Sequence, residues 1–281
     1  MLIRLRSVVA QYRWASAPAA IAILLVGAVR LLVWIPLQSP VDWEIYRDAA
    51  LRWQAGGTYF LPYQLAGPYT LGHGEVLYPP AILWLLVPFT HLPPVLWWLV
   101  PSGILVALIL WWRPRGWPLV GMAICLALHT TQSVYLTGRP TMWICAFFAL
   151  GLVRGGWGVF VLLKPSVFPV ALAGVRRRSW WVALLLFAAL CVPLGTGIWA
   201  DWIRAMRNSG GGPLYSIMDT FVFGVPALAW IGRTRGRQIS VPPSHGPGQD
   251  PCRSGHPQTP RDRPPPHPGG GIRSPAASTN G

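Results

Sequence analysis

The sequence predicts an all-α integral membrane protein, a polytopic bundle of about eight transmembrane helices with a short interfacial helix in the first outer loop. Hydrophobic residues make up 53% of the chain and charged residues only 11%, against roughly 25% charged residues in soluble globular domains. Long runs such as 97–112 and 180–192 are apolar on every helical face, which places a helix in a large core or in lipid. Several runs approach the ~20 residues that span the hydrocarbon. Their recurrence along residues 1–232 favours the bilayer.

The apolar runs give the expected order of helices. The helices are expected at residues 17–37, 80–92, 95–112, 117–136, 139–153, 157–174, 179–198 and 214–232. The N-terminal arginines favour a cytoplasmic N-terminus, and the arginine run at 176–178 then lies on the same side. We therefore expect a multi-pass protein of the cell (plasma) membrane with its N-terminus in the cytoplasm.

The segment 38–77 is the longest polar stretch within residues 1–232, and it forms the first outer loop if the N-terminus is inside. A short helix is expected at about residues 40–55, because a Ser-Pro pair can begin it and a Gly-Gly pair ends the pattern. Trp43 and Trp53 are typical interfacial anchors for a helix that lies on the membrane surface.

Composition changes abruptly after Gly232. Residues 233–281 contain 11 Pro, 8 Gly and 7 Arg and scarcely any large apolar side chain, so this segment cannot bury a core and is expected to be disordered. Two interpretations stay open, a genuine Pro/Gly/Arg-rich tail and a frame-shifted reading. The expected organisation is a polytopic membrane domain at 1–232 followed by this tail.

The basic charge and the cysteines point away from two other classes of protein. The formal net charge is +15, but the arginines lie between apolar runs and in the tail instead of forming a clustered patch, so a nucleic-acid partner is not expected. The four cysteines show no C-x-x-C spacing, which indicates neither a metal site nor a disulfide framework.

Ionisable residues in or beside a membrane body are candidates for function, and Asp42 opens the outer loop. A partly desolvated carboxylate can have its pKa raised and act as a general base toward a hydroxyl. The alternative is structural, because Ser39 and Asp42 have capping-box spacing and an acid suits the start of a helix. Local sequence leaves both interpretations open and favours the structural one.

Lys164 lies within an apolar run and is followed by Pro165. It could bind phosphate as a point charge or extend its amine to the membrane surface. A proline here opens backbone hydrogen bonds, which is tolerated where protein or a cavity satisfies them. That slightly favours a binding site.

Further candidates lie in the predicted last outer loop, 199–213. Arg204 and Arg207 are three residues apart and would share a helical face, so they could clamp an anionic phosphate, with Asn208 beside them. A solvated loop is the simpler interpretation. Tyr46 and Tyr78 could stack on a sugar ring, although tyrosine is also common at membrane interfaces without any ligand.

The order of these elements resembles one family. The motifs that carry the resemblance, in chain order, are Asp42-x-x-x-Tyr46, Tyr78-Pro79-Pro80, Gly138, Lys164-Pro165 and the Trp202…Asn208-Ser209 loop. Over residues 20–230 the chain is similar to the polyprenyl-phosphate-mannose-dependent α-mannosyltransferases of the GT-C superfamily. That family was long described as a domain of unknown function.

The resemblance implies an inverting hexosyltransferase. It would move a hexose, typically mannose, from a polyprenyl-phosphate donor to a glycolipid or cell-envelope glycan on the outer face. Asp42 then corresponds to the catalytic base, while Tyr78, Lys164 and Asn208 match recurring motif positions without firm roles. No cofactor is implied, because the donor carries its own lipid phosphate, and the lack of a D-x-D pair argues weakly against a required metal. The partners implied are the bilayer, the donor and the acceptor.

Two features depart from the family pattern. Arg139 stands where the family usually has glutamine after the glycine, and it joins the candidate donor- or acceptor-binding residues. Family members also carry further helices, so the resemblance implies that this chain is C-terminally truncated. A lipid or small-solute transporter, or flippase, with Lys164 at a midplane site remains the alternative, as does a truncated non-catalytic membrane protein.

Overall fold

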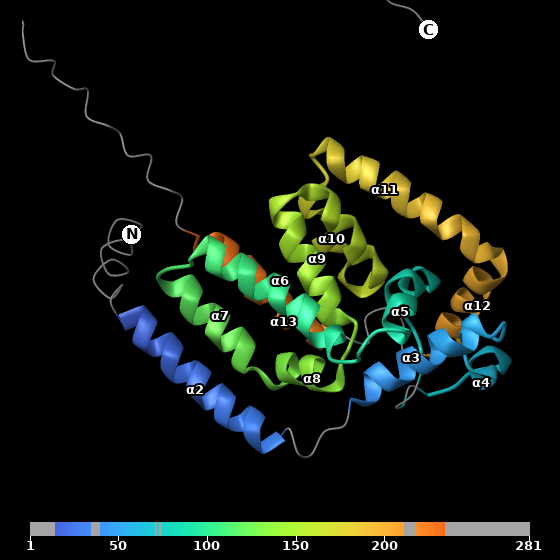
Figure 1. The fold of residues 1–281 in the computed structure, drawn as a ribbon, viewed down its shortest axis with the longest axis horizontal. Helices are drawn as coiled ribbons and strands as arrows, with labels where there is room; N and C mark the ends of the chain where they lie inside the picture. Colours follow the sequence, from blue (N-terminus) through green and yellow to red (C-terminus); the bar gives the residue numbers. More distant parts are fainter. Residues whose placement is uncertain (1–14, 35–39, 71, 73–74, 211–216, 234–281) are drawn as a thin grey trace, which may run out of the picture. The chain divides into compact units, whose positions relative to one another are not determined.

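The computed structural model describes residues 15–34, 40–70, 72, 75–210 and 217–233, and these residues form helices and connecting turns without a strand (Figure 1). The predicted all-α class is therefore confirmed for the described part of the chain. Ser39 and the tail beyond residue 233 lie outside it. The α-helices are α2 (Ser16–Trp34), α3 (Val41–Gln54), α4 (Pro62–Ala66), α5 (Leu83–Thr90), α6 (Leu96–Trp112), α7 (Trp117–Ala127), α8 (His129–Thr137), α9 (Thr141–Val153), α10 (Phe168–Ala171), α11 (Arg178–Cys191), α12 (Gly195–Asn208) and α13 (Phe221–Ile231).

Short 3-10 segments connect or extend several of these helices. They are η3 (Pro80–Ile82), η4 (Gly155–Leu163), η5 (Pro165–Val167), η6 (Leu172–Gly174), η7 (Val192–Leu194) and η8 (Ile217–Thr220). Proline accounts for several of the breaks, because it removes a backbone donor and disfavours helical geometry in the residue before it. Pro165 begins η5 in this way, immediately after the extended Lys164.

Two helices in the described part of the chain are long and apolar enough to cross a membrane, by length and composition. One is the window Ser16–Val33 of α2, and the other is the 31-residue stretch Arg178–Asn208, which joins α11, η7 and α12. The pair α7 and α8 makes a third if its 56° bend lies within one span. Eight spans are not confirmed, because the remaining apolar helices are only 10–17 residues long.

The helices pack in a continuous series around the apolar core. α2 lies on α7, α7 on α13, and α13 on both α6 and α9 (Figure 1). α9 packs on η4, which in turn contacts α11. α3 lies across α5, and α12 contacts α4. Segments far apart in sequence therefore meet at the ends of α3, α8 and α13.

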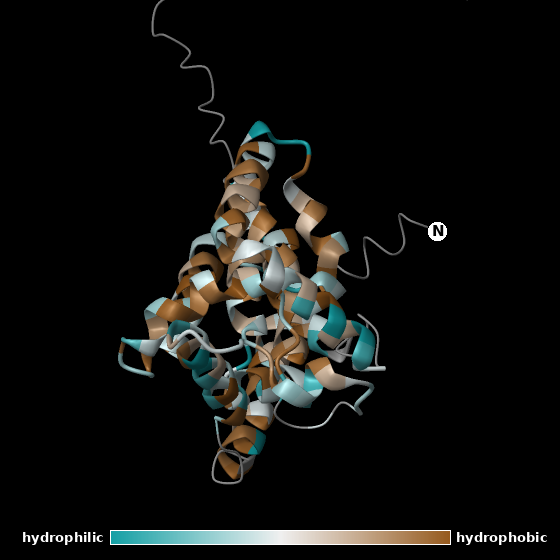
Figure 2. Cartoon of the chain, turned by 90° about the vertical axis from the view of Figure 1, so that its right-hand side faces the viewer, coloured by the Kyte–Doolittle hydropathy of each residue, from teal (hydrophilic) through white to brown (hydrophobic). Residues whose placement is uncertain are grey.

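The outward faces of the longest helices are apolar. Leu25, Val26 and Leu32 on α2 and Leu185 and Leu186 on α11 are all more than 60% exposed. Most of the helical ribbon in Figure 2 is coloured hydrophobic, and hydrophilic residues gather in short stretches. Contiguous exposed apolar surface of this kind is typical of a face that contacts lipid or another protein.

The structure agrees with some predicted boundaries and corrects others. The short helix expected at about 40–55 is α3, confirmed almost to the residue. The single helix expected at 157–174 is wrong, because η4 ends before Lys164 and a new segment starts at Pro165. The loop expected at 199–213 is also wrong as far as Asn208, since those residues continue α12. The helix expected at 117–136 is bent at Leu128.

Candidate functional site

Asp42 lies in the first turn of α3, where a carboxylate interacts favourably with the positive end of the helix dipole. The buried face of the helix next to it, formed by Trp43, Tyr46, Ala49 and Ala50, anchors α3 in the core. Asp42 itself stays about a quarter exposed. Ser39 lies outside the described residues, so capping by its side chain is untested.

Arg139 follows a glycine that ends α8 in a left-handed conformation. Gly138 has φ +75°, and a Cβ there would lie 2.8 Å from both Trp43 Cβ and Trp98 Cζ2, so only glycine fits this turn. The indole N–H of Trp97 donates to the Gly138 carbonyl (2.8 Å), and that of Trp98 donates to the Tyr135 carbonyl (2.7 Å). These two hydrogen bonds hold the C-terminal end of α8 in position. They thereby also position the backbone from which the Arg139 side chain extends.

Lys164 sits in the break between η4 and η5, in extended backbone with φ −126° and ψ 93°. Pro165 imposes that extended conformation on the residue before it. The side chain is only 6% exposed, so it does not reach the surface. The snorkelling interpretation is therefore wrong for Lys164.

Asp219 was not predicted as a site residue. It lies in η8, just before α13, and its side chain is 7% exposed. It is the only charged residue in the apolar run expected at 214–232. The principle that singled out Lys164, that a charge in an apolar run indicates function, applies equally to Asp219.

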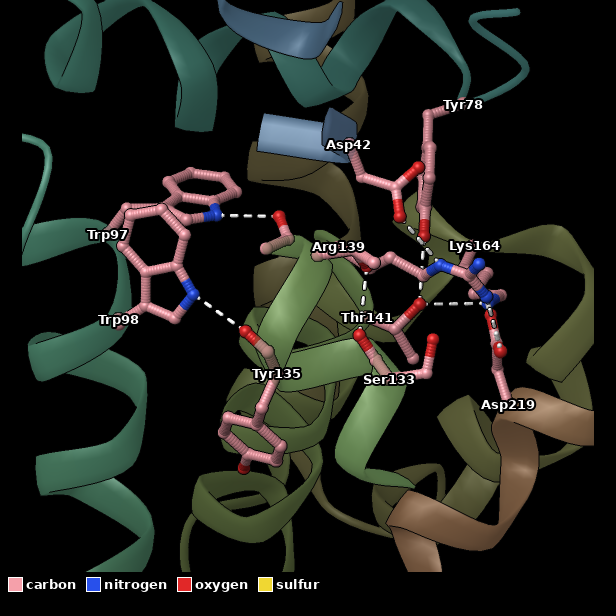
Figure 3. A network of polar contacts seen from close by, with 12 residues as sticks. Asp42, Tyr78, Trp97, Trp98, Ser133, Tyr135, Arg139, Thr141, Lys164 and Asp219 are labelled. Atoms are coloured by element: carbon pink, nitrogen blue, oxygen red, sulfur yellow. Dashed lines mark hydrogen bonds and ion pairs between the residues drawn. The ribbon is translucent and has the colours of Figure 1, made fainter. Parts of the chain in front are cut away.

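The four charged side chains form a continuous chain of ion pairs (Figure 3). Arg139 Nε donates to Asp42 Oδ2 at 2.9 Å, and Arg139 Nη1 donates to Asp219 Oδ1 at 3.0 Å. Lys164 Nζ donates to the other oxygen, Asp219 Oδ2, at 2.8 Å. Two carboxylates and two cations from four separate segments thus meet and balance in charge. We call Asp42, Arg139, Lys164 and Asp219 the four-charge cluster.

Two hydroxyls complete the buried end of this cluster. Lys164 Nζ also donates to Thr141 Oγ1 (2.9 Å), which shares a 2.9 Å hydrogen bond with the Tyr78 hydroxyl. The Tyr78 ring lies edge-to-face with Tyr46, with 5.2 Å between the ring centroids. Sequence reasoning missed Thr141, a fully buried residue at the first position of α9, for which no local pattern gives a signal.

Burial changes along the cluster from one end to the other. The side chains of Arg139 and Asp42 are 37% and 26% exposed. Burial by itself would lower the pKa of Arg139, but the charges of Asp219 and Asp42 outweigh it and raise that pKa, so the guanidinium stays charged. Burial also raises the pKa of Tyr78 above its usual range, so its hydroxyl stays neutral. The accessible end of the cluster is therefore the Asp42–Arg139 pair.

The accessible pair retains unused hydrogen-bonding atoms. Among the described residues, Asp42 Oδ1 has no hydrogen-bond partner, and neither does Arg139 Nη2. A carboxylate oxygen can accept a proton or a hydroxyl hydrogen bond, and a guanidinium N–H can donate to an anion. The site can thus present a base and an anion-binding group side by side.

The other predicted binding residues do not join this cluster. Arg204 and Arg207 are exposed on α12, and Arg204 pairs with Asp201 at 3.6 Å. Asn208 instead has a structural contact, because its Nδ2 donates to the Gln64 carbonyl at 2.9 Å. Its own carbonyl accepts from the Tyr69 backbone N–H at 2.9 Å, which ties the segment after α4 to α12.

An apolar cavity of about 370 Å³ lies among α2, α6, α7, α8 and α13. Its walls include Gly27, Leu105, Thr131, Gln132 and Tyr135. Small-molecule sites are typically 300–1,000 Å³ and mostly apolar, so this volume suits a hydrocarbon group. Tyr135 precedes the Gly138–Arg139 turn by one helical turn, which places the cavity on the same helix that leads into the cluster.

No group of His, Cys, Asp and Glu among the described residues is arranged to hold a metal ion. Comparison with known proteins gives no match among protein-family models, curated proteins or solved structures. The geometry of the cluster is therefore the main basis for a functional proposal.

Proposed function

We propose that this chain is a multi-pass membrane glycosyltransferase. It would move a hexose, mannose by the family resemblance, from a polyprenyl-phosphate donor to a glycolipid or cell-envelope glycan on the outer face of the plasma membrane. The observation that carries the proposal is the four-charge cluster, in which Asp42 keeps one oxygen unused while it pairs with Arg139, and Asp219 joins Arg139 to Lys164. Five of the eight residues expected at the site from sequence lie in it or against it: Asp42, Tyr46, Tyr78, Arg139 and Lys164.

The chemistry requires a base and a stabiliser for the leaving group. Asp42 would accept the proton of the acceptor hydroxyl while that oxygen bonds to the sugar C1. The bond from C1 to the phosphate oxygen breaks, and polyprenyl phosphate departs with the electron pair. Arg139, with Lys164 behind it, would stabilise the negative charge of the departing phosphate.

The surroundings suit a lipid-linked donor. Two or three helices are long enough to cross a bilayer, and the faces of α2 and α11 that would meet lipid are apolar. The apolar cavity beside α8 could hold hydrocarbon near the cluster. A sugar that arrives on a lipid phosphate needs no nucleotide-binding fold, and the described residues form an all-helical body.

Transfer is tested in vesicles that contain the full chain and polyprenyl-phosphate [¹⁴C]mannose, with a membrane glycolipid extract as acceptor. We expect label in the acceptor fraction and release of polyprenyl phosphate, at a rate that empty vesicles do not show. A flippase gives a different result, because the donor crosses the bilayer with its sugar–phosphate bond intact. Translocation without bond cleavage would replace the transferase proposal with the transporter alternative.

A further inference from the structure

The Asp42–Arg139 ion pair occupies both the candidate base and the accessible cation of the proposed site. Asp42 Oδ2 accepts from Arg139 Nε at 2.9 Å, so the carboxylate that should take a proton is held by the group that should hold phosphate. A phosphate that approaches Arg139 also meets the negative charge of Asp42. The closed contact weakens both functions, because an ion-paired carboxylate is a poorer base and a paired guanidinium attracts a further anion less strongly.

The two carboxylates of the cluster differ in how firmly they are held. Asp219 uses one oxygen on Arg139 and the other on Lys164, and it is 7% exposed. Asp42 makes a single ion pair and is 26% exposed. Removing a doubly paired, buried carboxylate from its cations is far less favourable than releasing a singly paired one at the surface. An incoming anion therefore displaces Asp42 and not Asp219.

We infer that the phosphate of a lipid phosphate ester, a diester in the donor and a monoester in the released product, binds this site by exchange, taking the place of the Asp42 carboxylate on Arg139 and releasing Asp42 as a free base. This inference rests on the proposed function, which supplies the phosphate as part of the donor. Arg139 has a further unused donor, Nη2, with which to hold the phosphate in a bidentate contact (Figure 3). Asp219 stays in place and keeps Arg139 and Lys164 oriented.

The exchange links binding of the donor to release of Asp42 as the base. Only a phosphate-bearing ligand breaks the Asp42–Arg139 pair, so the base is released when the donor is bound. A lipid with the same chain and no phosphate leaves the pair intact. The site thus selects for lipid phosphates over lipid alcohols through Arg139.

The test measures binding of farnesyl phosphate and of farnesol to the full chain in detergent micelles by titration calorimetry. Asp42→Asn is expected to bind farnesyl phosphate about tenfold more tightly than the wild type, because a competing and repelling charge is removed. Arg139→Gln is expected to bind it about tenfold more weakly or worse. Farnesol affinity should be the same in all three proteins.

Asp48→Asn is the matched control, because Asp48 is also an ion-paired carboxylate on α3 but its partner is Arg47, at 3.0 Å. The affinity of the Asp48→Asn variant for farnesyl phosphate should stay within about twofold of that of the wild type. Equal affinity of Asp42→Asn and wild type, or a gain in Asp48→Asn as large as in Asp42→Asn, overturns the exchange. The exchange is also overturned if neither the wild type nor any variant binds farnesyl phosphate. These measurements need no turnover, so a chain that shows the binding pattern but transfers no sugar refutes the proposed function and leaves the exchange standing.

Discussion

Replacing Asp42 by asparagine is expected to lower the rate of sugar transfer by about 10²–10⁴-fold, the usual contribution of a positioned general base. Asparagine keeps the size of the side chain but cannot take a proton from the acceptor hydroxyl. The effect should appear in kcat, measured as [¹⁴C]mannose transfer at saturating donor. The KM for the donor should stay the same or fall, because the Asp42 carboxylate no longer competes with the donor phosphate for Arg139.

Stability separates this catalytic effect from unfolding. The Asp42–Arg139 pair is partly exposed, so its loss should change the free energy of unfolding by no more than about 1 kcal/mol. Asp48→Asn and the exposed Arg207→Ala should transfer at the wild-type rate within about twofold. Full activity of Asp42→Asn would remove Asp42 from the role of base, whatever the other variants do.

Replacing Lys164 by methionine is expected to lower the free energy of unfolding by about 3–5 kcal/mol, the range found when one partner of a buried ion pair is removed. Asp219 is 7% exposed and would lose one of its two cations without gaining access to water. Thr141 Oγ1 would lose a donor as well. Thermal unfolding in detergent micelles measures the loss.

A second substitution tests whether the loss comes from the unpaired charge. The double variant Lys164→Met with Asp219→Leu removes both charges, and apolar replacement of a buried pair is often close to neutral. It should therefore recover much of the stability lost in Lys164→Met, as a double-mutant cycle would show. Asp201→Ala, which breaks an exposed pair with Arg204, should have an effect below about 1 kcal/mol. An unchanged unfolding temperature for Lys164→Met would contradict the structure of the cluster.

Local patterns in the sequence predict much of the helical framework. The Ser-Pro and Gly-Gly pairs bracket α3, and the apolar runs mark α2, α6 and α11. Helix continuity is predicted less well. Leu128 bends a long apolar run and Lys164-Pro165 breaks another, because a proline or a change of backbone angle interrupts a helix without changing its hydropathy.

The candidate site is only partly predictable, because its contacts join distant segments. Asp42 and Lys164 stand out as charges beside apolar runs, and Asp219 could have been found in the same way. The pairing itself gives no local signal, since Arg139 lies 97 residues from Asp42 and 80 from Asp219. Arg204 and Arg207 do share a helix as their spacing suggests, but both are exposed there, and Arg204 pairs with Asp201 on the same helix.

The most direct test of the four-charge cluster as the donor site is an experimental structure of the full chain, in lipid nanodiscs, with a polyprenyl phosphate bound. Donor binding by exchange requires the phosphate within hydrogen-bonding distance of the Arg139 guanidinium, the Arg139–Asp219 and Lys164–Asp219 pairs intact, and Asp42 released from Arg139. A phosphate bound at Arg204 and Arg207, or anywhere else while the Asp42–Arg139 pair stays closed, would contradict the claim that the four-charge cluster is the donor site.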